Sequence, residues 1–142
     1  MKNTRFVVAA AFALLVMLTP VFGQSAGYRV DVPFKFVVGN TTLAAGEYKV
    51  SVMKPGLLQL QRTDSRGTTS FFMTSYTGGG PYQDRRERLV FHTYGDHFFL
   101  SQVWIEDANP GHELYVSAAE LEYARAGHQT QTVLMAEGQP HK

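Results

Sequence analysis

The chain of 142 residues contains no cysteine. Disulfide bonds, a cysteine nucleophile and a lipid anchor on an acylated cysteine are therefore excluded. If such a chain is exported, its fold has to be held together by the hydrophobic core alone.

An excess of charge of either sign is also absent, with 13 Lys and Arg against 12 Asp and Glu. Removal of residues 1–23 would take away Lys2 and Arg5, which leaves 13 − 2 = 11 basic against 12 acidic residues and a net charge of −1. A nucleic-acid binder needs a basic surface to neutralise phosphates. The balance of charges therefore argues against nucleic acid as a partner.

The sequence has one long apolar run, residues 6–18, which lies within a segment typical of a secretory signal. Lys2 and Arg5 precede the run, and small or modest side chains follow it at residues 21 and 23, the −3 and −1 positions of a cleavage before Gln24. The run is shorter than the roughly 20 residues of an ordinary membrane span. We therefore expect a signal peptide over residues 1–23, with an uncleaved anchor as the alternative.

Cleavage before Gln24 would leave 142 − 23 = 119 residues, enough for one domain with a real core. We expect a single β-rich domain over residues 24–142, with a polar tail from about residue 137. No further apolar run in it is long enough to span a membrane, and the expected location is periplasmic or extracellular.

Residues 89–106, LVFHTYGDHFFLSQVWIE, predict a β-hairpin around which the domain is organised. Gly95 and Asp96 split two apolar runs and suit a primed turn, which needs positive φ. With these two as the turn residues, Tyr94 lies opposite His97 and the pairing ends with Leu89 opposite Gln102.

Alternation divides the side chains of this hairpin between two faces. The expected inward set is Leu89, Phe91, Phe98, Leu100 and Trp104, and the outward set is Val90, His92, Tyr94, His97, Phe99, Val103 and Ile105. The outward set is also mostly apolar, which is unusual for a strand exposed on one side. We expect another part of the chain to cover it; a partner or a ligand is the alternative.

The remaining pattern predicts a mainly β protein, an antiparallel β-sandwich or partly open β-barrel of about seven strands. The expected strands are residues 28–38, 47–53, 58–61, 69–76, 89–94, 97–106 and 129–136. Pro33 cannot donate to a ladder, so the first strand is kinked there or lies at an edge.

One short helix is expected from Ser117 to Gly127. Ser117 and Glu120 fit a capping box, residues 116 and 121 fit a hydrophobic staple, and Gly127 fits a left-handed C-cap. A helix of about ten residues is marginal alone, so it should pack through Ala118, Leu121 and Ala124.

Residues 32–48, VPFKFVVGNTTLAAGEY, carry a recognisable pattern. They resemble a family of small exported bacterial β-proteins whose mature part opens with PF-x-F-x-x-G…L-x-AG-x-Y. The hairpin sequence at residues 89–104 and the S-x-x-E stretch at residues 117–120 extend this resemblance over most of the mature chain. It implies an exported β-domain without an assigned activity, so it supplies no catalytic residues.

His92 and His97 are weak candidates for a metal site, together with Asp96. In the expected register the two imidazoles share one face on a diagonal, about 7–8 Å apart. Imidazole and carboxylate suit Zn²⁺ or Cu²⁺, but the spacing matches no standard motif and a third firm ligand is missing. A histidine paired with Tyr94 or the backbone is the expected alternative, and no metal or other cofactor is assigned.

Arg85, Arg86 and Arg88 form a basic cluster beside Tyr82, after a Gly-rich stretch. Guanidinium groups suit carboxylates and phosphates, and a nearby ring could stack on a sugar, so these four residues are a candidate binding surface. Interleaved acidic residues favour the simpler interpretation, a solvated charged loop. The stretch lacks the GK[ST] ending of a phosphate-binding loop.

A catalytic constellation is not identifiable, since there is no G-x-S-x-G elbow and the adjacent Glu106 and Asp107 select no acid–base pair. We therefore expect a non-enzymatic exported interaction or structural module that contacts another envelope or extracellular protein. The alternative is a carrier that holds a small apolar ligand in a barrel cavity. A metal-binding or hydrolytic protein is the third possible function.

Overall fold

A computed structural model of the chain describes residues 27–64, 67–78, 86–105 and 110–136. These residues form ten strands and one helix. The strands are β1 (Gly27–Val32), β2 (Phe36–Val38), β3 (Thr41–Leu43), β4 (Gly46–Lys54), β5 (Leu57–Arg62), β6 (Thr69–Thr77), β7 (Arg88–Tyr94), β8 (His97–Trp104), β9 (Gly111–Leu114) and β10 (Thr130–Met135), and the helix is α2 (Ala118–Ala126).

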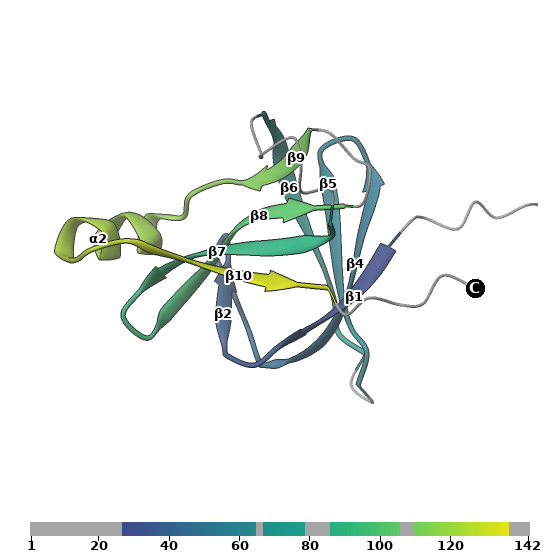
Figure 1. The fold of residues 1–142 in the computed structure, drawn as a ribbon, viewed down its shortest axis with the longest axis horizontal. Helices are drawn as coiled ribbons and strands as arrows, with labels where there is room; N and C mark the ends of the chain where they lie inside the picture. The colour runs from purple at the N-terminus through teal and green to yellow at the C-terminus, as the bar shows by residue number, and fades with distance from the viewer. Residues whose placement is uncertain (1–26, 65–66, 79–85, 106–109, 137–142) are drawn as a thin grey trace, which may run out of the picture.

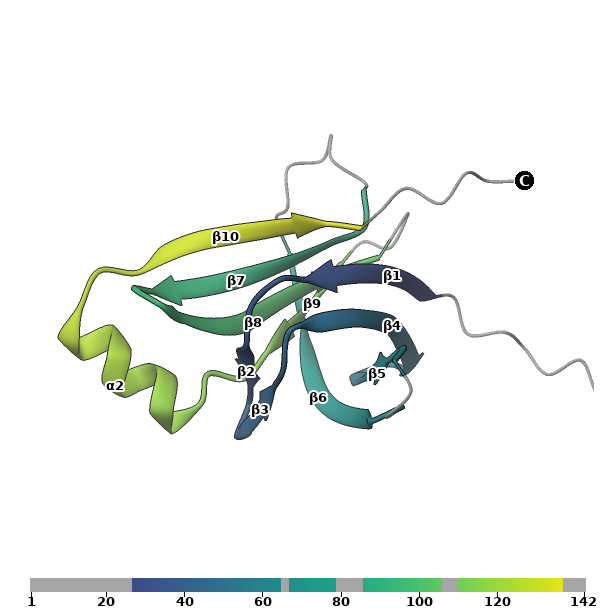
Figure 2. The same ribbon diagram turned by 90° about the horizontal axis from the view of Figure 1, so that it is seen from below.

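All ten strands belong to one sheet, which curls strongly (Figures 1 and 2). Its order is β1-β4-β5-β6-β9-β8, continued by β7 and β10 along the other edge of β8. β2 pairs in parallel with β8, and β3 follows it as an outer strand. Because β1 and β10 approach each other, the sheet has the form of an open barrel.

The mainly β class is confirmed, and the differences concern short strands. The expected strand 28–38 is kinked after Pro33: β1 pairs with β4, whereas β2 turns away to pair with β3 and β8. The predicted strands do not include residues 41–43 and 111–114, which form β3 and β9. Strands of three or four residues are too short for their alternation to be recognised.

The β7–β8 hairpin turns at Gly95, which has the expected positive φ of 57°. Its register is correct from Tyr94 opposite His97 as far as Phe91 opposite Leu100. The predicted pairing of Leu89 with Gln102 is wrong, because a β-bulge at Ser101 shifts the register by one residue.

This bulge also corrects the predicted faces, since one extra residue reverses the alternation that follows it. Val103 pairs with Leu89 and is buried in the core, although it was expected to face outward. Trp104, expected to face inward, lies opposite Arg88 and packs outside the core cluster.

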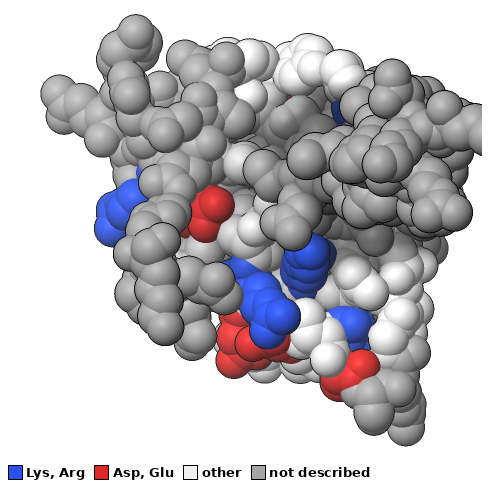
Figure 3. All heavy atoms as spheres, turned by 90° about the vertical axis from the view of Figure 1, so that its right-hand side faces the viewer, with Lys and Arg blue, Asp and Glu red and all other residues white. Residues whose placement is uncertain are grey.

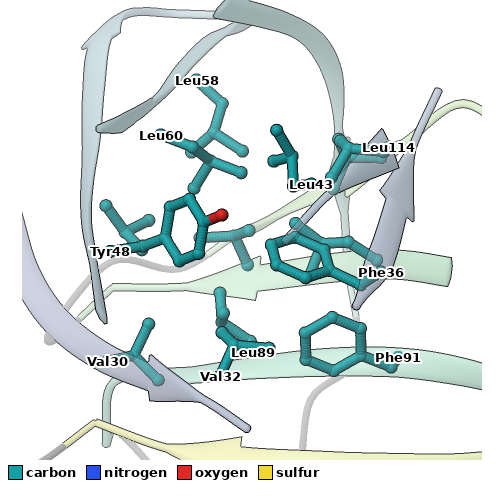
Figure 4. Close-up of a cluster of buried hydrophobic side chains, with 14 of the residues drawn as sticks. Val30, Val32, Phe36, Leu43, Tyr48, Leu58, Leu60, Leu89, Phe91 and Leu114 are labelled. Carbon is teal, nitrogen blue, oxygen red and sulfur yellow. The ribbon is translucent and has the colours of Figure 1, made fainter. Parts of the chain in front are cut away.

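The interior is lined by apolar side chains from strands distant in the sequence (Figure 4). Phe36 is central, with edge-to-face contacts to Tyr48 and Phe91 at centroid distances of 5.4 and 5.5 Å. Leu58 and Leu60 reach the same cluster from β5 and are at most 1% exposed. These contacts join both halves of the sheet in one core.

A buried hydrogen bond crosses the approach of β1 to β7 and β10. The Tyr28 hydroxyl donates to the carbonyl of Arg88 at 3.2 Å. Burial raises the pKa of Tyr28 well above its ordinary value, so the phenol stays protonated and can donate. The bond ties the first described strand to the hairpin.

Among the described residues, the helix is neither long nor apolar enough to cross a membrane. Basic and acidic side chains lie near one another on the face shown in Figure 3. The described residues include the ion pairs Arg29–Glu47 and Arg62–Asp64. Residues 1–26 and 137–142, the predicted signal and tail, lie outside the described part of the chain.

Trp104 packs on the backbone of Gly111, so this position should tolerate no side chain. A Cβ at residue 111 would lie 2.8 Å from the indole ring, so Gly111→Ala should destabilise the fold by about 1–3 kcal/mol through overpacking. Gly127→Ala is the matched control, because nothing lies within 4 Å of its Cβ position. Urea unfolding measures both, and equal free energies of unfolding would contradict the packing.

Stability should also fall in acid because of His112, which is buried beside Thr74 and Tyr76. Burial lowers the pKa of His112 from its ordinary 6.5, so below that pH the unfolded chain binds a proton that the folded chain resists. This contribution is fully present above pH 6.5 and declines as the pH falls below it.

The test is to compare the wild-type protein with His112→Phe by urea unfolding at about pH 7.5 and about pH 5. The variant should lose less stability than the wild type over this range, while the other histidines contribute equally to both. Identical pH dependences would show that His112 does not contribute.

Candidate functional site

Helix α2 lies beside the tip of the β7–β8 hairpin, at one end of the molecule (Figures 1 and 2). Its bounds are as predicted, and the Ser117 side chain caps it by accepting from the Glu120 amide at 3.1 Å. Gly127 is the C-cap, as predicted, and its amide donates to the Tyr123 carbonyl, but the predicted left-handed conformation is wrong, since Gly127 is extended with φ −159°.

The predicted packing of this helix is also wrong. Ala118, Leu121 and Ala124 are all exposed, and the residue of α2 that is buried is Glu120. Val116 and Leu121, the expected staple, are 53% and 48% exposed. The helix therefore docks through a carboxylate rather than through an apolar stripe.

The Glu120 carboxylate joins the helix to the outward face of β7. Its Oε1 lies 2.6 Å from Nδ1 of His92 and accepts a hydrogen bond from the Tyr94 hydroxyl at 3.3 Å. Burial and the adjacent carboxylate both raise the pKa of Tyr94, which keeps the phenol protonated as a donor. The sequence assigned Glu120 only to the capping box, but its side chain bonds to residues of β7 instead.

Strand β8 supplies the third member of this network. Ser101 follows Phe99 by two residues, so alternation places it on the outward face, diagonal to His92. The Ser101 Oγ lies 3.0 Å from Nε2 of His92. An ionised carboxylate only accepts, so in the neutral imidazole the tautomer that fits these contacts has its proton on Nδ1 and accepts from the serine hydroxyl at Nε2.

Aromatic rings complete the docking of α2. Tyr123 packs on His97 with a centroid distance of 4.2 Å, and it contacts Phe99 and Tyr94 at 5.7 and 6.5 Å. Both Tyr94 and Phe99 are buried. The prediction that the chain itself covers the outward face of the hairpin is therefore confirmed at its tip.

The chain Ser101–His92–Glu120 has the order of a nucleophile, a general base and an orienting carboxylate. A nucleophile must also reach its substrate, but Ser101 is only 5% exposed, within a strand that is paired along its length. We therefore assign to this network the docking of α2 on the sheet, which its contacts explain.

The histidine candidates do not come together as a metal site. Both ring nitrogens of His92 are engaged by Glu120 and Ser101, whereas His97 packs on Tyr123. Asp96 is exposed in the turn. Among the described residues, no group of three or more His, Asp or Glu side chains is arranged to hold a metal ion.

The predicted arginine surface is divided. Arg86 is exposed, but Arg88 is buried with its guanidinium 4.5 Å from the centre of the Trp104 ring, in a cation–π contact. The Arg88 Nη1 also donates to the carbonyl of Arg86 at 3.3 Å. Arg88 thus belongs to the packing of the sheet. Tyr82 and Arg85 lie outside the described residues, as do Glu106 and Asp107.

A second feature, missed from the sequence, is a row of apolar side chains on the outer face of the sheet. Met73 of β6 lies opposite Leu57 of β5, and Tyr115 is one step beyond the last pair of β6 with β9. Met73 is 71%, Tyr115 64% and the neighbouring Phe71 56% exposed. We call Leu57, Phe71, Met73 and Tyr115 the outer apolar row.

Comparison of the chain with protein-family models, with curated proteins and with solved structures gives no match. The resemblance noted from residues 32–48 therefore stays a prediction. Function has to be argued from the network around Glu120 and from the outer apolar row.

Replacement of Glu120 tests the docking network. Glu120→Ala leaves His92 and Tyr94 without their acceptor, which should lower the free energy of unfolding by about 1–3 kcal/mol. Glu122→Ala, an exposed carboxylate on the same helix, should change it by no more than about 0.5 kcal/mol. Urea unfolding measures both.

Treatment with a fluorophosphonate distinguishes docking from catalysis. We expect no covalent adduct on the folded protein, because Ser101 is buried. An adduct on Ser101 that is lost in His92→Gln would contradict the docking role and would identify an activated serine.

Proposed function

We propose that this protein is an exported, non-enzymatic binding domain that contacts another protein of the cell envelope or the extracellular space. The outer apolar row carries the proposal. Large exposed apolar side chains that adjoin one another on a folded domain are typical of an interaction surface. The β-sheet serves as the rigid support on which these side chains are displayed.

Export is supported by residues 1–23, with their basic start, apolar run and small residues before Gln24. The absence of cysteine means that the domain needs no oxidative folding on either side of a membrane. The cohesion of the domain comes instead from its core, in which Phe36, Tyr48 and Phe91 pack edge to face.

Binding through the outer face fits the described structure better than binding inside the sheet. The inward side chains of β2, β5 and β7 contact one another, and Phe36, Leu58 and Phe91 are at most 2% exposed. A carrier of a small apolar ligand would have to displace this packing, so it stays the alternative. A metal-dependent role has no support from His92, whose two nitrogens have partners within the chain.

Site-specific cross-linking in the producing cells tests the proposal. A photoreactive amino acid at Met73 should give a discrete cross-linked product in the extracytoplasmic fraction, since this side chain is the most exposed of the row. The same amino acid at Glu122 is the control, because Glu122 is an exposed residue of helix α2, outside the face formed by β5 and β6.

Cross-linking at Met73 and not at Glu122 would support a contact through the outer apolar row. Equal cross-linking at both positions, or none at Met73, would count against the proposal. A protein that remains in the cytoplasm with residues 1–23 attached would contradict export.

A further inference from the structure

We infer that the outer apolar row binds a second copy of this chain, face to face across a two-fold axis. The inference rests on the proposed function and names the partner of the same surface. It is carried by the charges that border the row and by the arrangement of the strands beneath it.

The centre of the surface is uncharged. The outward side chains of β5 and β6 are Leu57, Gln59, Gln61, Thr69, Phe71, Met73, Ser75 and Thr77. Depletion of charge at the centre, with apolar and aromatic side chains enriched there, is the usual anatomy of a protein–protein interface. Methionine adapts its shape to an apposed surface, and Met73 occupies the middle of the row.

The border of the surface carries charges of opposite sign on its two sides. A second bulge in β4 brings Lys54 opposite Leu57, beside the exposed Met53. On the far side, Glu113 of β9 lies opposite Ser75. Within the described residues, neither Lys54 nor Glu113 forms an ion pair.

A two-fold axis parallel to β6 makes this surface complementary to itself. Such an axis places the β4 side of one copy over the β9 side of the other, so that each Lys54 lies on the side of Glu113 of the second copy, offset by two residues along the strands, a gap that the two long side chains can span. The uncharged rows then lie on each other at the centre. An interface of this kind uses the same patch on both copies, as in most homodimers.

The contact is between faces of two sheets rather than between strand edges. β5 is paired on one side with β4 and on the other with β6, so its backbone groups are already used. Sheets that pack face to face keep their strands within about 30° of each other, which is compatible with the axis along β6.

The experiment measures the mass of the exported protein, produced with its own leader, by sedimentation velocity over a range of concentrations. We expect twice the mass of one chain for the wild-type protein. Met73→Glu places a carboxylate at the centre of the row and should raise the dimer dissociation constant at least about 100-fold. Val133→Ser, at an exposed apolar side chain of β10, should leave the dimer unchanged.

A charge exchange tests the orientation of the two copies. Lys54→Glu and Glu113→Lys should each weaken the dimer, because like charges then face each other, and the double variant should restore it. Circular dichroism and the thermal midpoint confirm that each variant is folded. A lack of restoration by the double variant would overturn the proposed two-fold arrangement.

A wild-type protein that is monomeric at all concentrations would overturn the second copy as partner. Cross-linking of Met73 to a different protein would then keep the proposed function while this inference fails. A dimer that persists in Met73→Glu would show that the copies associate through another surface, and would overturn the inference equally.

Discussion

The bulge at Ser101 is the constraint on which the arrangement around the hairpin depends. Without it, β8 would direct Trp104 into the core and Val103 toward the helix. With it, Val103 fills the interior beside Leu89, and Trp104 lies outside over Gly111 and Arg88. Ser101 itself keeps the outward side of the strand and lies 3.0 Å from His92, so the irregularity decides the core and the outer packing on either side of Trp104 while the docking network stays on the outward face.

Attachment of a helix through a buried carboxylate has a physical consequence. Removal of a charge from water is costly unless hydrogen bonds replace the lost solvation. Glu120 receives them from His92 and Tyr94, while Ser117 caps the backbone one turn earlier. These hydrogen bonds are directional, so they restrict the position of α2 more tightly than the contacts of an apolar helix face would. The apolar side chains of the helix, Leu121 among them, then remain on the outside.

Much of the fold could be predicted from the sequence because alternation is a strong signal over long strands. The alternation from Tyr28 to Val38, the turn at Gly95 and the boundaries of α2 all followed from local rules. The bulge could not be predicted, because Ser101 differs in no local property from a regular strand residue. Once one residue is inserted, every later assignment to a face is reversed.

The candidate site was predictable only in part, for the same reason. His92 was predicted as a weak metal ligand or as a partner of Tyr94, whereas its partners are Glu120 of the helix and Ser101 of β8, of which the hairpin register contains only Ser101. Arg88 was grouped with its sequence neighbours, whereas its position opposite Trp104 follows from the shifted register. Proximity in the sequence therefore did not indicate which residues Arg88 contacts.

The outer face of the sheet is covered over β7 and β8 but exposed over β5 and β6, although both regions carry aromatic residues. Over β7 and β8 the chain supplies its own cover, so that Tyr94 and Phe99 are buried under α2. Over β5 and β6 no described element covers Phe71 and Met73, which remain more than half exposed. A folded chain gains nothing for its own stability from large apolar side chains left in water, since their burial is what contributes free energy. That free energy is therefore still available to be released when a second surface excludes water from the row.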